Sequence, residues 1–193
     1  IFCVLGTLVG TGVLGTPVES SSGGALSADA TRLAPAGPAF SIWSVVYLGL
    51  AAYTVWQWLP HQTTSRRQRR TGWLAAASMV LNAAWLLVTQ QGWIWVSVGV
   101  IGLLVVTLGV MVRRLTETAP TSDTIAEQVV VDGTFGLYLG WVAVATCANV
   151  TAALVDSGVD PAPPLADLAA VLVVGVAAAI GVGVAVNQAK AGI

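Results

Sequence analysis

The stretch Trp93–Val112, WIWVSVGVIGLLVVTLGVMV, runs for 20 residues without a charged side chain, and Arg113 and Arg114 follow it directly. A helix needs about 20 mostly apolar residues to cross the hydrocarbon core of a bilayer. Inside that core every backbone hydrogen bond must be made within the protein, and a helix achieves this on its own. We therefore predict that Trp93–Val112 is a transmembrane helix.

The rest of the chain has the same apolar character. Of its 193 residues, 56% are hydrophobic and 9% are charged, and the mean hydropathy is +0.82. In soluble domains about a quarter of all residues are charged, so an ordinary soluble fold is excluded. Most nucleic-acid binding is excluded too, because it requires a basic surface. The fold class that we predict is an all-α, polytopic membrane helix bundle.

Six segments are long and apolar enough, or nearly so, to be spans of this bundle. The first of them also allows an interpretation as the end of a signal peptide, but its glycine spacing favours a packed helix. The six predicted spans are Ile1–Thr16, Phe40–Leu59, Gly72–Thr89, Trp93–Val112, Val129–Leu154 and Leu165–Val186. The short polar turn at Gln90–Gly92 predicts that the third and fourth spans form an antiparallel hairpin.

The basic residues predict the orientation of the bundle. When the chain is threaded through the six spans, seven of its eight Lys and Arg residues fall on one side, and only Arg32 falls opposite. Loops rich in Lys and Arg stay in the cytoplasm. We therefore expect cytoplasmic N- and C-termini and external loops at 17–38 and 156–165. The seven residues expected on the cytoplasmic side are Arg66, Arg67, Arg69, Arg70, Arg113, Arg114 and Lys190.

The eight tryptophans fall into two sets by depth. Five lie near the ends of predicted spans, where an aromatic belt at headgroup level is expected: Trp56, Trp58, Trp73, Trp93 and Trp95. The other three lie deeper, and polar or aromatic residues share their helix faces. The deep tryptophans are Trp43, Trp85 and Trp141, and their companions are Tyr47, Asn82, Tyr138 and Asn149.

The two deep asparagines need hydrogen-bond partners, so we expect Asn82 and Asn149 to face the interior of the bundle. One interpretation is that they hold helices together by hydrogen bonds across the interface. The other is that these stripes line a ligand cavity with indole walls and a few polar groups. Spacing alone leaves both open.

Three blocks in the same stripes resemble the TspO/MBR family, the tryptophan-rich sensory proteins that include the translocator protein. They are Pro35–Tyr47 (PAGPAFSIWSVVY), Leu81–Trp85 (LNAAW) and Tyr138–Asn149 (YLGWVAVATCAN). The resemblance covers roughly Ile1 to Leu154. This chain has Ser41, Leu86 and Leu137 where the family usually has prolines, so it resembles a divergent branch.

The resemblance implies a TspO-like five-helix domain over residues 1–155, with a ligand pocket covered by the loop between the first two helices. Residues 156–193 would then add an external Pro-rich loop and a sixth transmembrane helix. Family members bind tetrapyrroles such as protoporphyrin and haem, sterols and benzodiazepine-like drugs, often as homodimers. The segment Glu19–Ala25 would be a mobile lid.

We therefore expect a membrane receptor or carrier for a flat, hydrophobic ligand such as a porphyrin, a sterol or a similar isoprenoid. We expect no obligatory cofactor, although porphyrin, haem or lipid would be a bound ligand. The expected partners are the bilayer, this ligand and no nucleic acid. The predicted ligand-binding residues are Trp43, Tyr47, Asn82, Trp85, Tyr138, Trp141 and Asn149.

Two other functions are weighed against this one. Small-residue faces, such as Gly6-x-x-x-Gly10 and the Gly-rich span Leu165–Val186, suit an accessory subunit, an assembly factor or a homodimer. Some bacterial relatives are proposed to degrade porphyrins, but we identify no catalytic set and no metal ligands. His61, the only histidine, is expected to be a solvated cap.

One acidic residue falls inside a predicted span. Asp132 lies close to the start of Val129–Leu154. An acid within a span is a functional candidate by default. A carboxylate near a helix N-terminus is also favoured by the helix macrodipole, and from its position we expect Asp132 to cap the helix.

Overall fold

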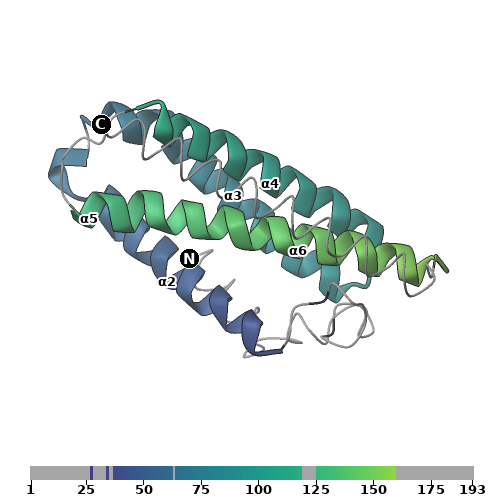
Figure 1. Cartoon of the computed structure of the whole chain (residues 1–193). Helices are drawn as coiled ribbons and strands as arrows, with labels where there is room; N and C mark the ends of the chain where they lie inside the picture. Colours follow the sequence, from purple (N-terminus) through teal and green to yellow (C-terminus); the bar gives the residue numbers. More distant parts are fainter. Residues whose placement is uncertain (1–26, 28–33, 35–36, 63, 119–124, 160–193) are drawn as a thin grey trace.

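The computed structural model describes residues 37–62, 64–118 and 125–159, together with residues 27 and 34. These residues form a bundle of long helices and contain no strand (Figure 1). Several of the sequence predictions lie outside the described residues: the spans Ile1–Thr16 and Leu165–Val186, the lid Glu19–Ala25, the Gly6-x-x-x-Gly10 face, and most of the external loops 17–38 and 156–165.

The described chain folds into helices joined by short turns. Their order is η3 (Gly37–Ser41), α2 (Ile42–Gln57), η4 (Pro60–Gln62), α3 (Arg66–Gln90), α4 (Ile94–Thr116), α5 (Ile125–Glu127), η5 (Gln128–Gly133) and α6 (Thr134–Asp156). The elements η3 and η4 are 3-10 turns, and η5 is a π-helical turn that joins α5 to α6.

Four helical segments are long and apolar enough to cross a membrane, namely Pro38–Gln57, Arg66–Gln90, Ile94–Thr116 and Ile125–Asp156. The prediction of an all-α membrane helix bundle is therefore confirmed. The four predicted spans between residues 40 and 154 each correspond to one of these segments, with shifted ends.

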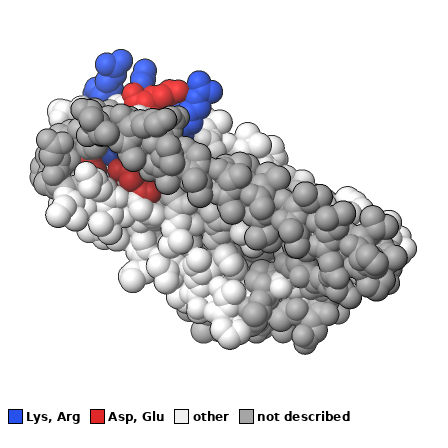
Figure 2. Space-filling model, viewed as in Figure 1, with Lys and Arg blue, Asp and Glu red and all other residues white. Residues whose placement is uncertain are grey.

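The largest shift is at the start of α3, which begins at Arg66 and not at Gly72. Ser65 caps this helix, because its hydroxyl oxygen accepts a hydrogen bond from the backbone N–H of Gln68 at 3.2 Å. The four neighbouring arginines, which were expected between the spans Phe40–Leu59 and Gly72–Thr89, therefore lie in the first turns of α3. All described Lys and Arg side chains gather at this end of the bundle (Figure 2).

The predicted hairpin between α3 and α4 is confirmed. Gly92 has a φ of +74°, a conformation that glycine adopts without strain. Its N–H donates to the Thr89 carbonyl at 3.1 Å, and the Trp93 N–H donates to the Val88 carbonyl at 3.3 Å. This is the Schellman pattern that ends a helix, and it turns the chain directly into α4.

The inward face of α3 is largely polar, which is unusual for a membrane helix. Hydroxyl groups on this face bond to the backbone of their own helix: Thr71 to the Arg67 carbonyl at 2.9 Å and Ser78 to the Ala75 carbonyl at 2.8 Å. Arg67 and Asn82 are on the same face and find their partners on other helices. The buried residues of α3 are Arg67, Thr71, Ala75, Ser78, Asn82, Trp85, Leu86 and Thr89.

Close packing holds α2 against α6. A Cβ atom added to Gly49 would lie 2.7 Å from the hydroxyl oxygen of the buried Thr134. Near this contact the rings of Tyr53 and Phe135 meet edge to face, with their centroids 4.8 Å apart. A small residue at position 49 is therefore what lets the two helix backbones approach each other.

We expect Gly49→Ala to lower the free energy of unfolding by about 1–3 kcal/mol, because the new methyl group overpacks the contact with Thr134. Denaturant or thermal unfolding in detergent micelles measures this change. The matched control is Gly136→Ala on α6, whose added Cβ meets nothing within 4 Å. We expect the control to be neutral or up to about 1 kcal/mol more stable. Equal effects of the two substitutions would contradict this packing.

Candidate functional site

Trp43 of α2 is the centre of a cluster of aromatic rings from three helices. It stacks on Tyr47 with centroids 5.6 Å apart and on Trp85 of α3 with centroids 5.9 Å apart. It meets two rings of α6 edge-on, Tyr138 at 6.3 Å and Trp141 at 6.2 Å. Stacked and edge-on pairs at these distances are the favoured arrangements of aromatic side chains.

Burial separates the deep tryptophans from the others. The exposed fractions of Trp43, Trp85 and Trp141 are 4%, 3% and 8%. In contrast, Trp58 and Trp73 are 82% and 84% exposed, Trp93 and Trp95 are also exposed, and Trp56 is half-buried. Burial within the bundle therefore separates the same two sets of tryptophans, and their depth in the membrane stays a prediction.

Polar groups lie among the rings. The Asn82 amide nitrogen donates to the Tyr47 hydroxyl oxygen at 3.0 Å, and the Tyr138 hydroxyl donates to the Ser78 carbonyl at 3.4 Å. Asn82 is buried, as predicted. The structure thus brings together six of the seven predicted site residues: Trp43, Tyr47, Asn82, Trp85, Tyr138 and Trp141.

Three buried polar atoms of this cluster have no hydrogen-bond partner in the structure. They are the indole nitrogens of Trp85 and Trp141 and the amide oxygen of Asn82. Most buried polar groups in proteins are paired, and an unpaired one costs about 1–3 kcal/mol. The cluster therefore offers two hydrogen-bond donors and one acceptor in an otherwise apolar setting.

The seventh predicted residue has a different neighbour. Asn149 is fully buried, as predicted, and its amide oxygen accepts a hydrogen bond from the Ser97 hydroxyl of α4 at 3.0 Å. It lies eight residues after Trp141 on α6, or roughly 12 Å along the helix axis. Its polar contact therefore joins α6 to α4.

Two residues near these sites were missed in the sequence. Phe40 meets Trp141 edge-on at 6.2 Å, and its position three residues before Trp43 was a usable signal, because such residues share a helix face. Ser97 is one of only two hydroxyl residues in the apolar run Trp93–Val112. Its pairing with Asn149 depends on the packing of two helices, which spacing within one helix does not show.

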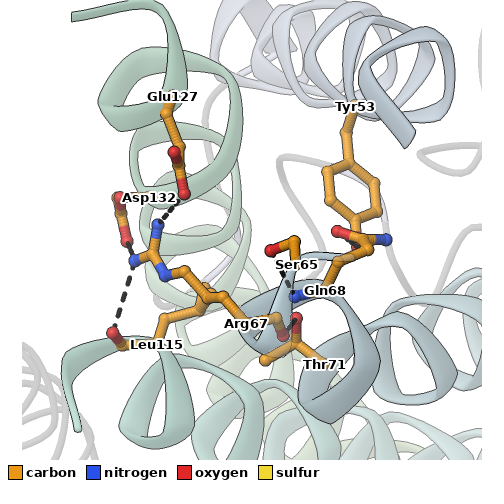
Figure 3. Close-up of polar contacts among 8 residues, drawn as sticks. All are labelled: Tyr53, Ser65, Arg67, Gln68, Thr71, Leu115, Glu127 and Asp132. Atoms are coloured by element: carbon orange, nitrogen blue, oxygen red, sulfur yellow. Dashed lines mark hydrogen bonds and ion pairs between the residues drawn. The ribbon is translucent and has the colours of Figure 1, made fainter. Parts of the chain in front are cut away.

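A second polar cluster is centred on Arg67, at the arginine-rich end of the bundle (Figure 3). Its guanidinium donates to the Glu127 carboxylate at 3.0 Å, to the Leu115 carbonyl at 3.3 Å and to the Asp132 carboxylate. The Arg67 and Glu127 side chains are only 5% and 3% exposed, and Asp132 is 29% exposed. One buried guanidinium therefore joins α3, the end of α4 and the α5–η5 segment.

The prediction that Asp132 caps a helix is wrong. The helical segment begins at Ile125 rather than at Val129, so Asp132 lies beyond the first turn, within the π-helical turn η5. Its carboxylate pairs with the inward-pointing Arg67 instead, because a buried guanidinium needs counter-charges and hydrogen-bond acceptors. π-helical turns are often found at functional sites.

A neutral contact lies beside this ionic cluster. The amide nitrogen of Gln68 on α3 donates to the hydroxyl oxygen of the buried Tyr53 on α2 at 3.1 Å. Figure 3 shows Tyr53 and Gln68 facing each other beside the Arg67 cluster. The polar contacts at this end thus reach α2 as well.

Comparison with known families matches residues 1–192 to a model described as TSPO-like protein. The chain belongs to the TSPO-like protein family. The match confirms the resemblance seen in the three sequence blocks, and it continues past them to residue 192. No curated protein and no solved structure matches this TSPO-like protein.

In the TSPO-like protein we expect Arg67→Gln to lower the free energy of unfolding by about 3–5 kcal/mol, because it leaves carboxylates inside the bundle without a counter-charge. Unfolding in an uncharged detergent measures the loss. The matched control is Arg113→Gln, which breaks the exposed pair between Arg113 and Glu117 and should cost at most about 1 kcal/mol. Losses of the same size would show that the Arg67 cluster does not hold the helices together.

Proposed function

We propose that this TSPO-like protein is a membrane receptor or carrier that binds a flat, hydrophobic and partly polar ligand at the aromatic cluster around Trp43. One observation carries the proposal: rings from α2, α3 and α6 meet in a buried cluster that leaves two indole N–H groups and one amide oxygen unpaired. Family membership supports the ligand class, since the TspO/MBR relatives bind tetrapyrroles and sterols.

The rings supply the apolar part of the site. Because they already contact one another, a bound ligand has to replace some of the contacts between rings. An aromatic pair contributes about 0.5–1.5 kcal/mol beyond its buried area. The free energy lost when such a pair separates is therefore small compared with the free energy gained when a large ring system is buried. A flat ligand that stacks on Trp43 regains the same kind of contact with its own faces.

The unpaired atoms supply the polar part of the site and favour one ligand class over another. A carboxylate or carbonyl of the ligand would accept hydrogen bonds from the indole N–H groups of Trp85 and Trp141, and the O–H of a protonated carboxyl group would donate to the Asn82 amide oxygen. A porphyrin with acidic side chains offers both kinds of group, whereas a sterol offers a single hydroxyl. The proposed ligand is therefore a tetrapyrrole rather than a sterol.

The position of the cluster along α3 suggests the side from which the ligand arrives. Trp85 lies five residues before the end of α3 at Gln90, or roughly 8 Å, but 19 residues after Arg66, or roughly 28 Å. If the arginine-rich end is cytoplasmic, as the positive-inside rule predicts, the cluster lies in the external half of the membrane. We propose that the ligand binds from the external side.

We expect Trp85→Phe and Trp141→Phe each to weaken the binding of protoporphyrin about 2- to 10-fold, because each substitution keeps an aromatic ring but removes one hydrogen-bond donor. Titration of the purified protein, followed by porphyrin absorbance, gives the dissociation constants. Trp73→Phe is the matched control, since Trp73 lies on the outer surface. Equal affinities of all three variants would place the ligand elsewhere.

Substitutions of the two buried asparagines test how far the ligand site extends along the bundle. Asn82→Ala should weaken binding, because it removes the unpaired acceptor beside the rings. A comparable loss in Asn149→Ala would extend the site toward α4, and an unchanged affinity would limit it to the rings. If no variant changes porphyrin binding and a protein partner co-purifies in stoichiometric amount, the bundle is instead an accessory subunit.

A further inference from the structure

Five exposed arginines lie at one end of the bundle and take no part in the aromatic site (Figure 2). Three are at the start of α3 and two are at the end of α4. Arg67, their neighbour in sequence, points the opposite way and is buried. The exposed set, called the arginine patch below, is Arg66, Arg69, Arg70, Arg113 and Arg114.

The arginine patch continues the lipid-facing surface of α3. At helical spacing, Arg66, Arg69 and Arg70 fall on the same outward stripe as the exposed apolar residues that follow them. This stripe is opposite the polar inward face of α3, so in a membrane it faces lipid. Its exposed apolar residues are Trp73, Ala76, Ala77, Val80 and Leu87.

The same relation holds on α4, where Arg113 and Arg114 end an outward stripe of exposed apolar residues. The members of this stripe are Val96, Gly99, Leu103, Val106 and Val110. The two stripes meet at the arginine patch, because the Arg114 guanidinium donates to the Arg70 carbonyl at 3.0 Å. The guanidinium groups of both helices thus form one surface where lipid-facing stripes reach headgroup level.

Few negative charges balance this surface. Glu117 pairs with Arg113 at 2.8 Å, and within the described ranges no carboxylate pairs with Arg66, Arg69, Arg70 or Arg114. The first turn of α3 contains no acidic residue, so the positive end of its helix dipole adds to the patch.

The patch is also confined to one side of the bundle. Trp58, which directly follows α2, and Ile125, the first residue of α5, are exposed and carry no charge. The positive-inside rule requires only that basic residues lie on the cytoplasmic side. It does not explain why the exposed arginines gather on α3 and α4 alone among the described helices.

We propose that the arginine patch binds the headgroups of anionic phospholipids, with the phosphate held by guanidinium groups of α3 and α4 and the acyl chains along the two outward stripes. Guanidinium groups bind phosphate oxygens through two parallel hydrogen bonds. Trp73 lies one turn beyond Arg69 and Arg70 on the same stripe, and an indole there belongs at the boundary between headgroups and hydrocarbon. A soluble phosphate would gain nothing from these stripes.

The test is native mass spectrometry of the full chain with equal amounts of phosphatidylglycerol and phosphatidylcholine that carry the same acyl chains. The wild type should retain phosphatidylglycerol preferentially. A basic residue near an anionic surface changes lipid affinity about fivefold. The triple variant Arg66→Gln, Arg69→Gln, Arg70→Gln should therefore lose at least about tenfold of the preference. The triple Arg-to-Lys variant keeps the charges but loses the bidentate hydrogen bonds, so its preference should lie between that of the wild type and that of the Gln variant.

A second variant covers the case in which the Gln triple fails to fold. Arg113→Gln with Arg114→Gln removes the other half of the patch and should also lower the preference. An unchanged preference in this double variant would overturn the proposal. Glycerophosphoglycerol, the headgroup without acyl chains, should not compete with the lipid at equal concentration. If it competes fully, the patch is a site for soluble anions and not for membrane lipid.

Discussion

Helix α3 crosses the membrane with a polar inward face, and the other described helices are arranged to satisfy it. In hydrocarbon no water is available to pair with a buried polar group. The hydroxyl groups of the face bond to their own backbone, but a guanidinium and an amide cannot do so completely. Arg67 therefore binds the end of α4 and the α5–η5 segment, and Asn82 binds Tyr47 of α2.

The aromatic cluster lies on the same face of α3. Trp85 stacks on Trp43, and Trp43 in turn meets the rings of α6. Three polar atoms in this cluster stay unpaired, as do four other buried polar atoms of the described residues, the Nε of Arg67 among them. Each such atom costs free energy, and the three in the cluster differ from the others because they lie together around one set of aromatic rings. We interpret the unpaired atoms as the part of the site that a ligand completes.

The outward face of α3 follows from the position of its polar residues. Because the polar residues of α3 turn inward, its opposite side is apolar and faces lipid, and the exposed arginines lie where that side leaves the hydrocarbon. Arg66 and Arg67 are adjacent in sequence but have opposite roles. One extends the lipid-facing stripe, and the other is a buried tie between helices.

Much of this could be predicted from the sequence. Apolar runs identified the membrane bundle and the four described spans, and residue spacing identified six of the residues that meet around Trp43. The start of α3 was missed because four arginines resemble a loop, while the cap at Ser65 shows only in the structure. The partners of Arg67, Asp132 and Asn149 were also missed. These contacts depend on how the helices pack against one another, and the spacing of residues within one helix gives no information about that packing.

The most direct measurement is photo-crosslinking of the purified protein with a protoporphyrin that carries a diazirine, followed by mass spectrometry of the labelled peptides. Saturable labels on the α2, α3 and α6 peptides that contain Trp43, Trp85 and Trp141 are the result we expect. Labels restricted to peptides of the outer surface, such as those with Trp58 or Trp95, would contradict the central claim that the ligand binds among the buried rings.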